Sequence, residues 1–233
     1  MTRSRRPTLE AVAARAGVSR ATVSRVVNGL PTVTPQIREN VMRAIEELGY
    51  IPNSAARSLV TKRTDSYALV ASEPPSRVFS DDPLFSMVIR TVSVELEAAD
   101  KQVVLMLASS PRSHARIERY IAGGHVDGVM LISMHSADPL PAAIMRVGVP
   151  VVSYGRPAVN VEMPFVDNDN VGGARRAVEH LLAIGRRRIA TIAGPQDMIG
   201  GQDRLAGYRE ALRGSGRRSI VAVGDFTRES GAV

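Results

Sequence analysis

The sequence predicts a small all-α head that contains a helix-turn-helix, followed by a larger α/β body in which parallel strands alternate with crossover helices. The first observation is a change of apolar period. Helical spacing runs to residue 60, and short apolar runs alternate with amphipathic stretches from Tyr67 onward. The second is charge, because residues 1–64 hold 11 of the 30 Lys and Arg but only 4 of the 23 Asp and Glu. The net charge of +7 therefore lies in the head, as is typical of domains that bind nucleic-acid phosphates.

The composition excludes several classes of function. The 233 residues contain no cysteine, so disulfides, thiolate catalysis and cysteine zinc sites are excluded. The basic start Met1–Pro7 has no apolar run after it, and no segment is apolar for long enough to span a bilayer, so we expect a cytoplasmic protein without a membrane partner. The four histidines lack ligand spacing and no serine lies in a nucleophile elbow. We expect no metal site, no cofactor and no enzymatic activity, and an enzyme with a DNA-binding head is the alternative.

The head opens with a short amphipathic helix. Thr8 is placed to cap it, and apolar residues recur at i, i+3, i+4 and i+7 from Leu9 to Ala16. Gly17 ends the helix in a tight turn, and Ser19 caps the next helix. Two helices joined by such a corner form a helix-turn-helix.

The second helix has two different faces. Val23, Val26 and Val27 form an apolar side at helical spacing. The opposite side suits hydrogen bonds to base edges and phosphates, and consists of Arg20, Ala21, Ser24, Arg25 and Asn28. We interpret this helix as a DNA recognition helix, and a merely solvated polar face is the alternative.

A third helix completes the head. Thr34 is placed as its N-cap, Pro35 as its first residue, and Gly49 as its end, with an apolar stripe from Ile37 to Leu48. Residues 54–60 then predict a brief helix of small residues, which is too short to be stable alone and needs a partner.

These motifs resemble the DNA-binding headpiece of the lactose-repressor and galactose-repressor (LacI-type) family of bacterial transcription regulators. The matching stretches include Thr8-Leu9, Ala16-Gly17-Val18-Ser19, Thr22 to Asn28, Leu48-Gly49-Tyr50 and Pro52-Asn53. The resemblance implies that Arg20 and Ala21 choose the operator bases and that Arg25 makes a more invariant contact. It assigns contacts that position the DNA backbone mostly to Ser19, Thr22, Ser24, Asn28, Thr34, Tyr50 and Asn53, and includes Thr8 and Leu9 in the DNA-facing set.

The resemblance also explains the short helix at 54–60. It implies that two such helices pack through Ala55 and Ala56 when two subunits lie on DNA, and that Leu59 enters the minor groove as a wedge. The alternative is that Leu59 docks on the body.

The body alternates between strand and helix signals. Strands are expected at 67–71, 103–108, 128–132, 149–154, 188–193 and 220–223. Helices are expected at 84–99, 113–122, 142–147, 171–184 and 205–213. Ligands of such sheets gather at the carboxyl ends of the strands.

The body resembles the family's effector domain, which has the periplasmic-binding-protein type I fold of two α/β subdomains around a cleft. Matching stretches include His125 to Gly128, Val149 to Val152, Val166 to Asp169, and Arg204 with Gly207-Tyr208. The resemblance implies that Arg204 hydrogen-bonds a sugar or another small effector. It places Phe85, Met198 and Asp203 nearby, with plain core packing as the alternative for Phe85 and surface or interdomain pairing for Arg204.

Together these observations predict three segments: a headpiece at 1–52, a hinge at 53–64 and an effector-binding and dimerisation domain at 65–233. The resemblance implies a homodimeric repressor that binds a near-palindromic operator and responds to a small metabolite, possibly a sugar. Family chains continue beyond the position that matches Val233, so we expect the second subdomain to be incomplete. A truncated regulator that binds DNA without an effector response is the alternative.

Overall fold

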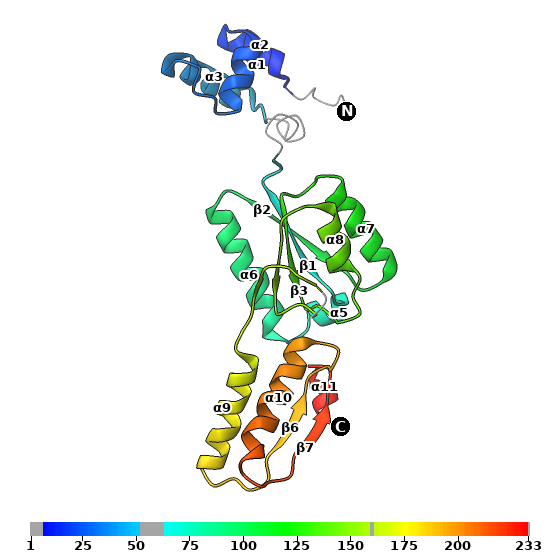
Figure 1. The fold of residues 1–233 in the computed structure, drawn as a ribbon. Helices are drawn as coiled ribbons and strands as arrows, with labels where there is room; N and C mark the ends of the chain where they lie inside the picture. Colours follow the sequence, from blue (N-terminus) through cyan, green and yellow to red (C-terminus); the bar gives the residue numbers. More distant parts are fainter. Residues whose placement is uncertain (1–6, 52–62, 159–160, 233) are drawn as a thin grey trace. The chain divides into compact units, whose positions relative to one another are not determined.

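The computed structural model describes residues 7–51, 63–158 and 161–232, which belong to two compact units, 1–64 and 65–233 (Figure 1). The first unit is helical and the second is an α/β unit. The predicted hinge helix at 54–60 lies outside the described residues.

The three helices of the head are α1 (Leu9–Ala16), α2 (Arg20–Val27) and α3 (Pro35–Leu48). The Thr8 side chain accepts a hydrogen bond from the Ala11 N–H, and Ser19 accepts one from Thr22. Gly17 ends α1 with a φ of 68°, a left-handed conformation that glycine adopts without strain. The predicted helices are therefore confirmed, although the Thr34 side chain makes no capping hydrogen bond.

The head's core lies where the three helices meet. Val12, Val23 and Val41 are fully buried, one from each helix. The remaining buried residues are Ala13, Val26, Ala44 and Tyr50. Val27, which was expected in the core, is only partly buried. Burial of this apolar side leaves the opposite side of α2 outside the core.

The first half of the body is a five-stranded parallel sheet in the order β2-β1-β3-β4-β5. Its strands are β1 (Ser66–Ala71), β2 (Gln102–Leu107), β3 (Gly128–Ile132), β4 (Val151–Tyr154) and β5 (Phe165–Val166). Its helices are α5 (Pro75–Val78), α6 (Pro83–Ala98), α7 (Pro111–Ala122) and α8 (Leu140–Val147).

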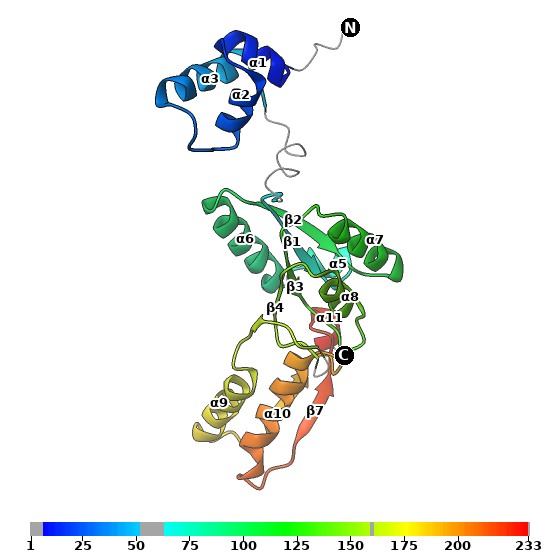
Figure 2. The same cartoon turned by 45° about the horizontal axis from the view of Figure 1, so that its top comes forward.

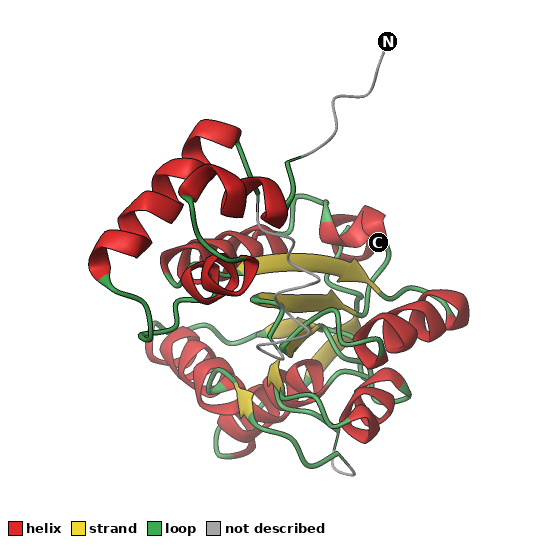
Figure 3. Ribbon diagram, turned by 90° about the horizontal axis from the view of Figure 1, so that it is seen from above, coloured by secondary structure: helices red, strands yellow, loops and turns green. Residues whose placement is uncertain are grey.

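Helices cover both faces of this sheet, with α6 on one face and α7 and α8 on the other (Figures 1, 2 and 3). Alternate residues of β1 therefore enter different cores. Ala68 and Val70 belong to the core that includes Ile117 of α7, and Leu69 belongs to the core that includes Phe85 of α6. Burial on both faces is typical of parallel sheets.

The second half of the body has the strands β6 (Ala190–Ala193) and β7 (Ile220–Val223), which pair in parallel. Its helices are α9 (Asn170–Ala183), α10 (Ile199–Arg213) and α11 (Arg228–Gly231). The buried Tyr208 hydroxyl accepts a hydrogen bond from the Ile220 N–H at 2.9 Å and lies 2.9 Å from the Ile189 carbonyl oxygen. Tyr208 thus ties α10 to both strands.

Some predicted boundaries of the body are wrong. The helix predicted from Leu205 begins at Ile199, because Gly200 and Gly201 lie inside the helix and not in a loop. Two predicted strands each begin two residues later than expected, at Val151 and Ala190. The short elements α5 and β5 were not predicted.

Candidate DNA-binding surface and effector site

The polar face of α2 is available at the surface of the head. Arg20, Ala21 and Arg25 are exposed, whereas Ser24 and Asn28 are half-buried. The Asn28 side-chain amide donates a hydrogen bond to the Ser24 hydroxyl at 3.3 Å, which orders the end of the helix. The face therefore presents cationic and hydrogen-bonding groups beside one small residue.

Arg20, the first residue of α2, contacts the preceding helix. Its Nε lies 3.0 Å from Oε1 of Glu10 on α1. A second exposed pair joins Arg15 of α1 to Glu47 of α3 at 2.5 Å. Arg38 of α3 donates from its guanidinium to the Leu30 carbonyl at 2.9 Å and so fixes the loop between α2 and α3.

The other predicted DNA-facing residues differ in their surroundings. Tyr50 is 9% exposed and packs in the core of the head, so most of its side chain is unavailable to DNA. Thr8, Ser19 and Thr34 are exposed, whereas Leu9 and Thr22 are half-buried. Asn53, Ala56 and Leu59 lie outside the described residues. The DNA contacts of these side chains stay predictions.

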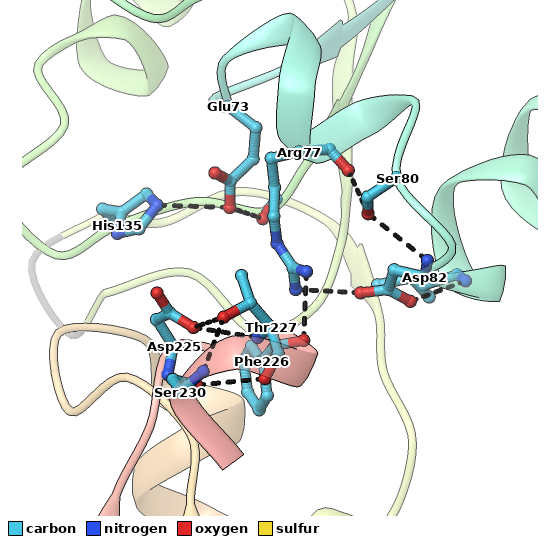
Figure 4. A network of polar contacts seen from close by, with 11 residues as sticks. Glu73, Arg77, Ser80, Asp82, His135, Asp225, Phe226, Thr227 and Ser230 are labelled. Atoms are coloured by element: carbon cyan, nitrogen blue, oxygen red, sulfur yellow. Dashed lines mark hydrogen bonds and ion pairs between the residues drawn. The ribbon is translucent and has the colours of Figure 1, made fainter. Parts of the chain in front are cut away.

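In the body, loops after β1, β3 and β6 meet in a polar network. Figure 4 shows its contact between Glu73 and His135. His135 lies between two carboxylates, with Nδ1 at 2.7 Å from Asp197 and Nε2 at 3.5 Å from Glu73. The Ser133 hydroxyl donates to Glu73 at 2.6 Å. The Ser136 N–H and hydroxyl both donate to the Asp197 carbonyl at 2.7 Å. The network joins the five-stranded half of the body to the half that contains α10.

The protonation of His135 makes the stability of the body depend on pH. The hydrogen bond to Glu73, and then Asp197, raises the pKa of His135 from 6.5 to about 9. Because the folded pKa is the higher one, this stabilisation is complete below pH 6.5 and is lost as the pH rises through 9. Asp197 is 56% exposed and solvent screens the pair, so we expect a loss of about 1 kcal/mol. Unfolding of the wild type and His135→Gln should therefore differ at pH 6 and converge near pH 10. An equal difference at both pH values would contradict this assignment.

A second polar contact joins the halves near the end of β7. The guanidinium of Arg77, on α5, donates to the Phe226 carbonyl at 3.1 Å and pairs with Asp82 at 2.8 Å (Figure 4). Asp225 accepts hydrogen bonds from Thr227, which together with one from Ser230 lower the pKa of Asp225 to about 2. These contacts fix the backbone on both sides of Phe226.

Arg204 lies on α10 against this turn. Its Nε donates to Oδ1 of Asn170, a buried residue at the start of α9, at 2.8 Å. The guanidinium lies over the Phe226 ring, 5.4 Å from its centroid. Phe226 adopts a φ of 66°, rare for a bulky residue, and its ring closely approaches Gly194. The cluster of Arg204, Asn170 and Phe226 thus combines an exposed cation, Arg204, with an aromatic ring, Phe226, that is 38% exposed.

The other predicted effector residues are not all in this cluster. Asp203 pairs with Arg156 through two contacts of 2.6 and 2.7 Å, and Met198 immediately precedes α10. Phe85 is 1% exposed and packs in the core beneath Arg77, 5.8 Å from its guanidinium. The structure therefore favours the core-packing alternative for Phe85.

Sequence reasoning missed Asn170 and Phe226, which lie next to Arg204. Asn170 follows the quoted Val166 to Asp169 motif, and Phe226 follows a predicted strand by three residues. Position at a strand's carboxyl end could have identified Phe226.

Within the described ranges, no helix is long and apolar enough to cross a membrane, and no three His, Asp or Glu side chains form a metal-binding group.

Two family models match the chain. Residues 8–53 match bacterial regulatory proteins of the lacI family, and residues 74–232 match periplasmic binding proteins and the sugar binding domain of the LacI family. The chain belongs to the LacI family. It is a DNA-binding transcriptional regulator and not an enzyme.

Named relatives agree with this membership. The transcriptional regulator CelR of Thermobifida fusca is 52% identical over 99% of this LacI-family chain and 69% of its own length. MalR of Streptococcus pneumoniae is 33% identical over 88% of the chain and 62% of its length.

Two solved structures are similar to the chain over 97% of its length and 68% of theirs. A CelR–cellobiose complex has 49% identity and a TM-score of 0.68. The lac repressor dimer bound to operator and the anti-inducer ONPF has 28% identity and a TM-score of 0.81.

Proposed function

We propose that the chain represses transcription as a homodimer that binds a near-palindromic operator, and that a sugar of the cellobiose type controls this binding. The observation that carries the proposal is the exposed polar face of α2, on a head that holds the net charge of +7. The basic head supplies attraction to phosphates at any sequence, and α2 supplies the choice of bases.

Arg20 and Ala21 are proposed as the base-reading residues. The planar guanidinium of Arg20 can donate two hydrogen bonds to O6 and N7 of guanine, whereas Ala21 offers only a methyl contact or space. Arg25 is proposed as a further contact in each half-site. Contacts to phosphates and sugars are assigned to Ser19, Thr22, Ser24, Asn28 and Thr34.

Leu59 is proposed as the minor-groove wedge of the paired hinge helices. Leu59→Ala should keep weak, salt-sensitive binding to any DNA, because the basic head is unchanged, but should lose most of the preference for operator. Titration of operator and scrambled duplexes measures both affinities. An equal loss on the two duplexes would rule out the wedge.

The effector site is proposed at Arg204, Asn170 and Phe226, with Met198 and Asp203 at its border. The planar fork of Arg204 suits vicinal hydroxyls, and the exposed part of the Phe226 ring suits the C–H groups of a sugar. The cellobiose named in the complex of the 49% identical CelR supports a glucose disaccharide as the first ligand to test.

Cellobiose should change the affinity of the protein for its operator by about 5- to 150-fold, the usual range of allosteric coupling. Arg204→Ala should abolish this change while leaving operator affinity without sugar unaltered, because the head is intact. Arg209→Ala is the matched control, since Arg209 is exposed on the same helix. If the wild type binds operator with the same affinity with and without cellobiose or other disaccharides, the effector proposal is wrong. The proposal that the chain binds DNA would still hold.

A further inference from the structure

Glu10 connects α1 to the residue that is proposed to read the DNA. Its carboxylate lies 3.0 Å from the Nε of Arg20, and the two side chains come from successive helices of the head. A backbone hydrogen bond, the Thr8 hydroxyl and the Arg20 charge hold the pKa of Glu10 below its ordinary value. Glu10 is therefore a carboxylate anchored at the start of α1.

This pair contributes little to folding. The side chains of Arg20 and Glu10 are 73% and 60% exposed, and ion pairs of that exposure add little to stability. The ion pair instead affects the orientation of Arg20. An arginine side chain has several rotatable bonds, and it loses much of its conformational freedom in a fixed contact.

The atom that Glu10 contacts matters for base reading. The recorded contact of the Glu10 carboxylate is with Nε, whereas the two terminal Nη groups of the guanidinium are the ones that can donate together to guanine O6 and N7. Arg20 is also the first residue of α2, and the N-terminal residues of a recognition helix are the ones that contact base edges.

The negative charge of Glu10 has a second effect, which is to weaken binding to DNA of any sequence. A carboxylate on a DNA-facing side of the head repels phosphates whatever the sequence. Removing it should therefore strengthen binding to random DNA while weakening the preference for the correct base.

We propose that Glu10 is a positioning residue that determines specificity, because it holds Arg20 ready for bidentate contact with guanine, while its charge weakens binding to all DNA alike. This inference rests on the proposed DNA-reading role of α2.

The test compares Glu10→Ala with Glu47→Ala, which removes the same charge and a similar exposed pair from Arg15 without touching Arg20. The full chain is titrated with its operator, selected from a random DNA pool, and with the same duplex in which the guanine read by Arg20 is replaced. Glu10→Ala should lower the ratio of the two affinities by about three- to fivefold, the most that so exposed a pair can contribute, with unchanged or stronger binding to the replaced duplex. Glu47→Ala should leave that ratio within twofold of the wild type.

A double variant separates positioning from a general effect of the head. Arg20→Lys has no Nε and cannot form the fork, so adding Glu10→Ala to it should change the ratio no further. An unchanged ratio in Glu10→Ala, an equal loss on both duplexes, or a further loss in the double variant would each overturn the inference. A wild type that does not distinguish the duplexes would instead overturn the DNA-reading role on which it rests.

Discussion

Arg20→Ala should lose about 5- to 150-fold of the preference for operator over scrambled DNA. The expected loss corresponds to the roughly 1–3 kcal/mol that a bidentate arginine–guanine contact contributes. Affinity for scrambled DNA should fall much less, because only one positive charge is removed from the head. Equilibrium titration of both duplexes at one fixed salt concentration gives the two values.

Arg43→Ala is the matched control for this loss. Arg43 is an exposed arginine on α3 that pairs with Glu39 of the same helix at 3.7 Å, and its removal changes the charge of the head equally. The control should leave the preference for operator unchanged. A similar loss of preference in Arg43→Ala would show that charge, and not base contact, accounts for the effect of Arg20.

Gly207→Ala should lower the free energy of unfolding of the body by about 3 kcal/mol, the upper part of the usual range for overpacking. A Cβ at Gly207 would lie 2.1 Å from the Val171 carbonyl oxygen and 3.1 Å from the Ala174 Cβ. The first contact is with backbone, so α9 and α10 would have to move apart. Because these helices carry Asn170 and Arg204, the displacement should also separate that hydrogen-bonded pair.

Gly173→Ala is the control for the same kind of substitution. Gly173 lies within α9, and nothing lies within 4 Å of the Cβ that alanine would add. Alanine favours a helix interior over glycine by up to about 1 kcal/mol, so this variant should be slightly more stable than the wild type. Denaturant unfolding of both variants measures the two changes in the free energy of unfolding, which should have opposite signs. Two small and equal changes would contradict the close packing of α9 on α10.

Local signals explain why the head could be predicted from its sequence. Thr8, Gly17, Ser19 and Gly49 each determine a helix end through a cap or a left-handed turn that depends on residues nearby in the chain. The apolar spacing of α1, α2 and α3 then assigns the core. Tyr50 was expected at DNA but is buried, since its burial depends on packing between helices and not on local sequence.

The effector site could be predicted only in part. The pair of Arg204 with Asn170 joins residues 34 apart in the chain, and the pair of His135 with Asp197 joins residues 62 apart, so no local pattern indicates either. The helix predicted at 205–213 did not include Gly201. Within α10 it allows the approach of the Pro195 carbonyl, which lies 2.2 Å from where a Cβ would stand.

The most direct test of the central claim, that the head reads a two-fold related DNA sequence through α2, is selection of bound duplexes from a random pool at physiological salt. The account predicts enrichment of a near-palindrome, with half-site centres about one helical turn, roughly 10 base pairs, or a multiple of this apart. Each half-site should contain a guanine whose enrichment disappears in Arg20→Ala. A wild type that enriches no sequence, or an Arg20→Ala variant that enriches the same bases, would contradict it.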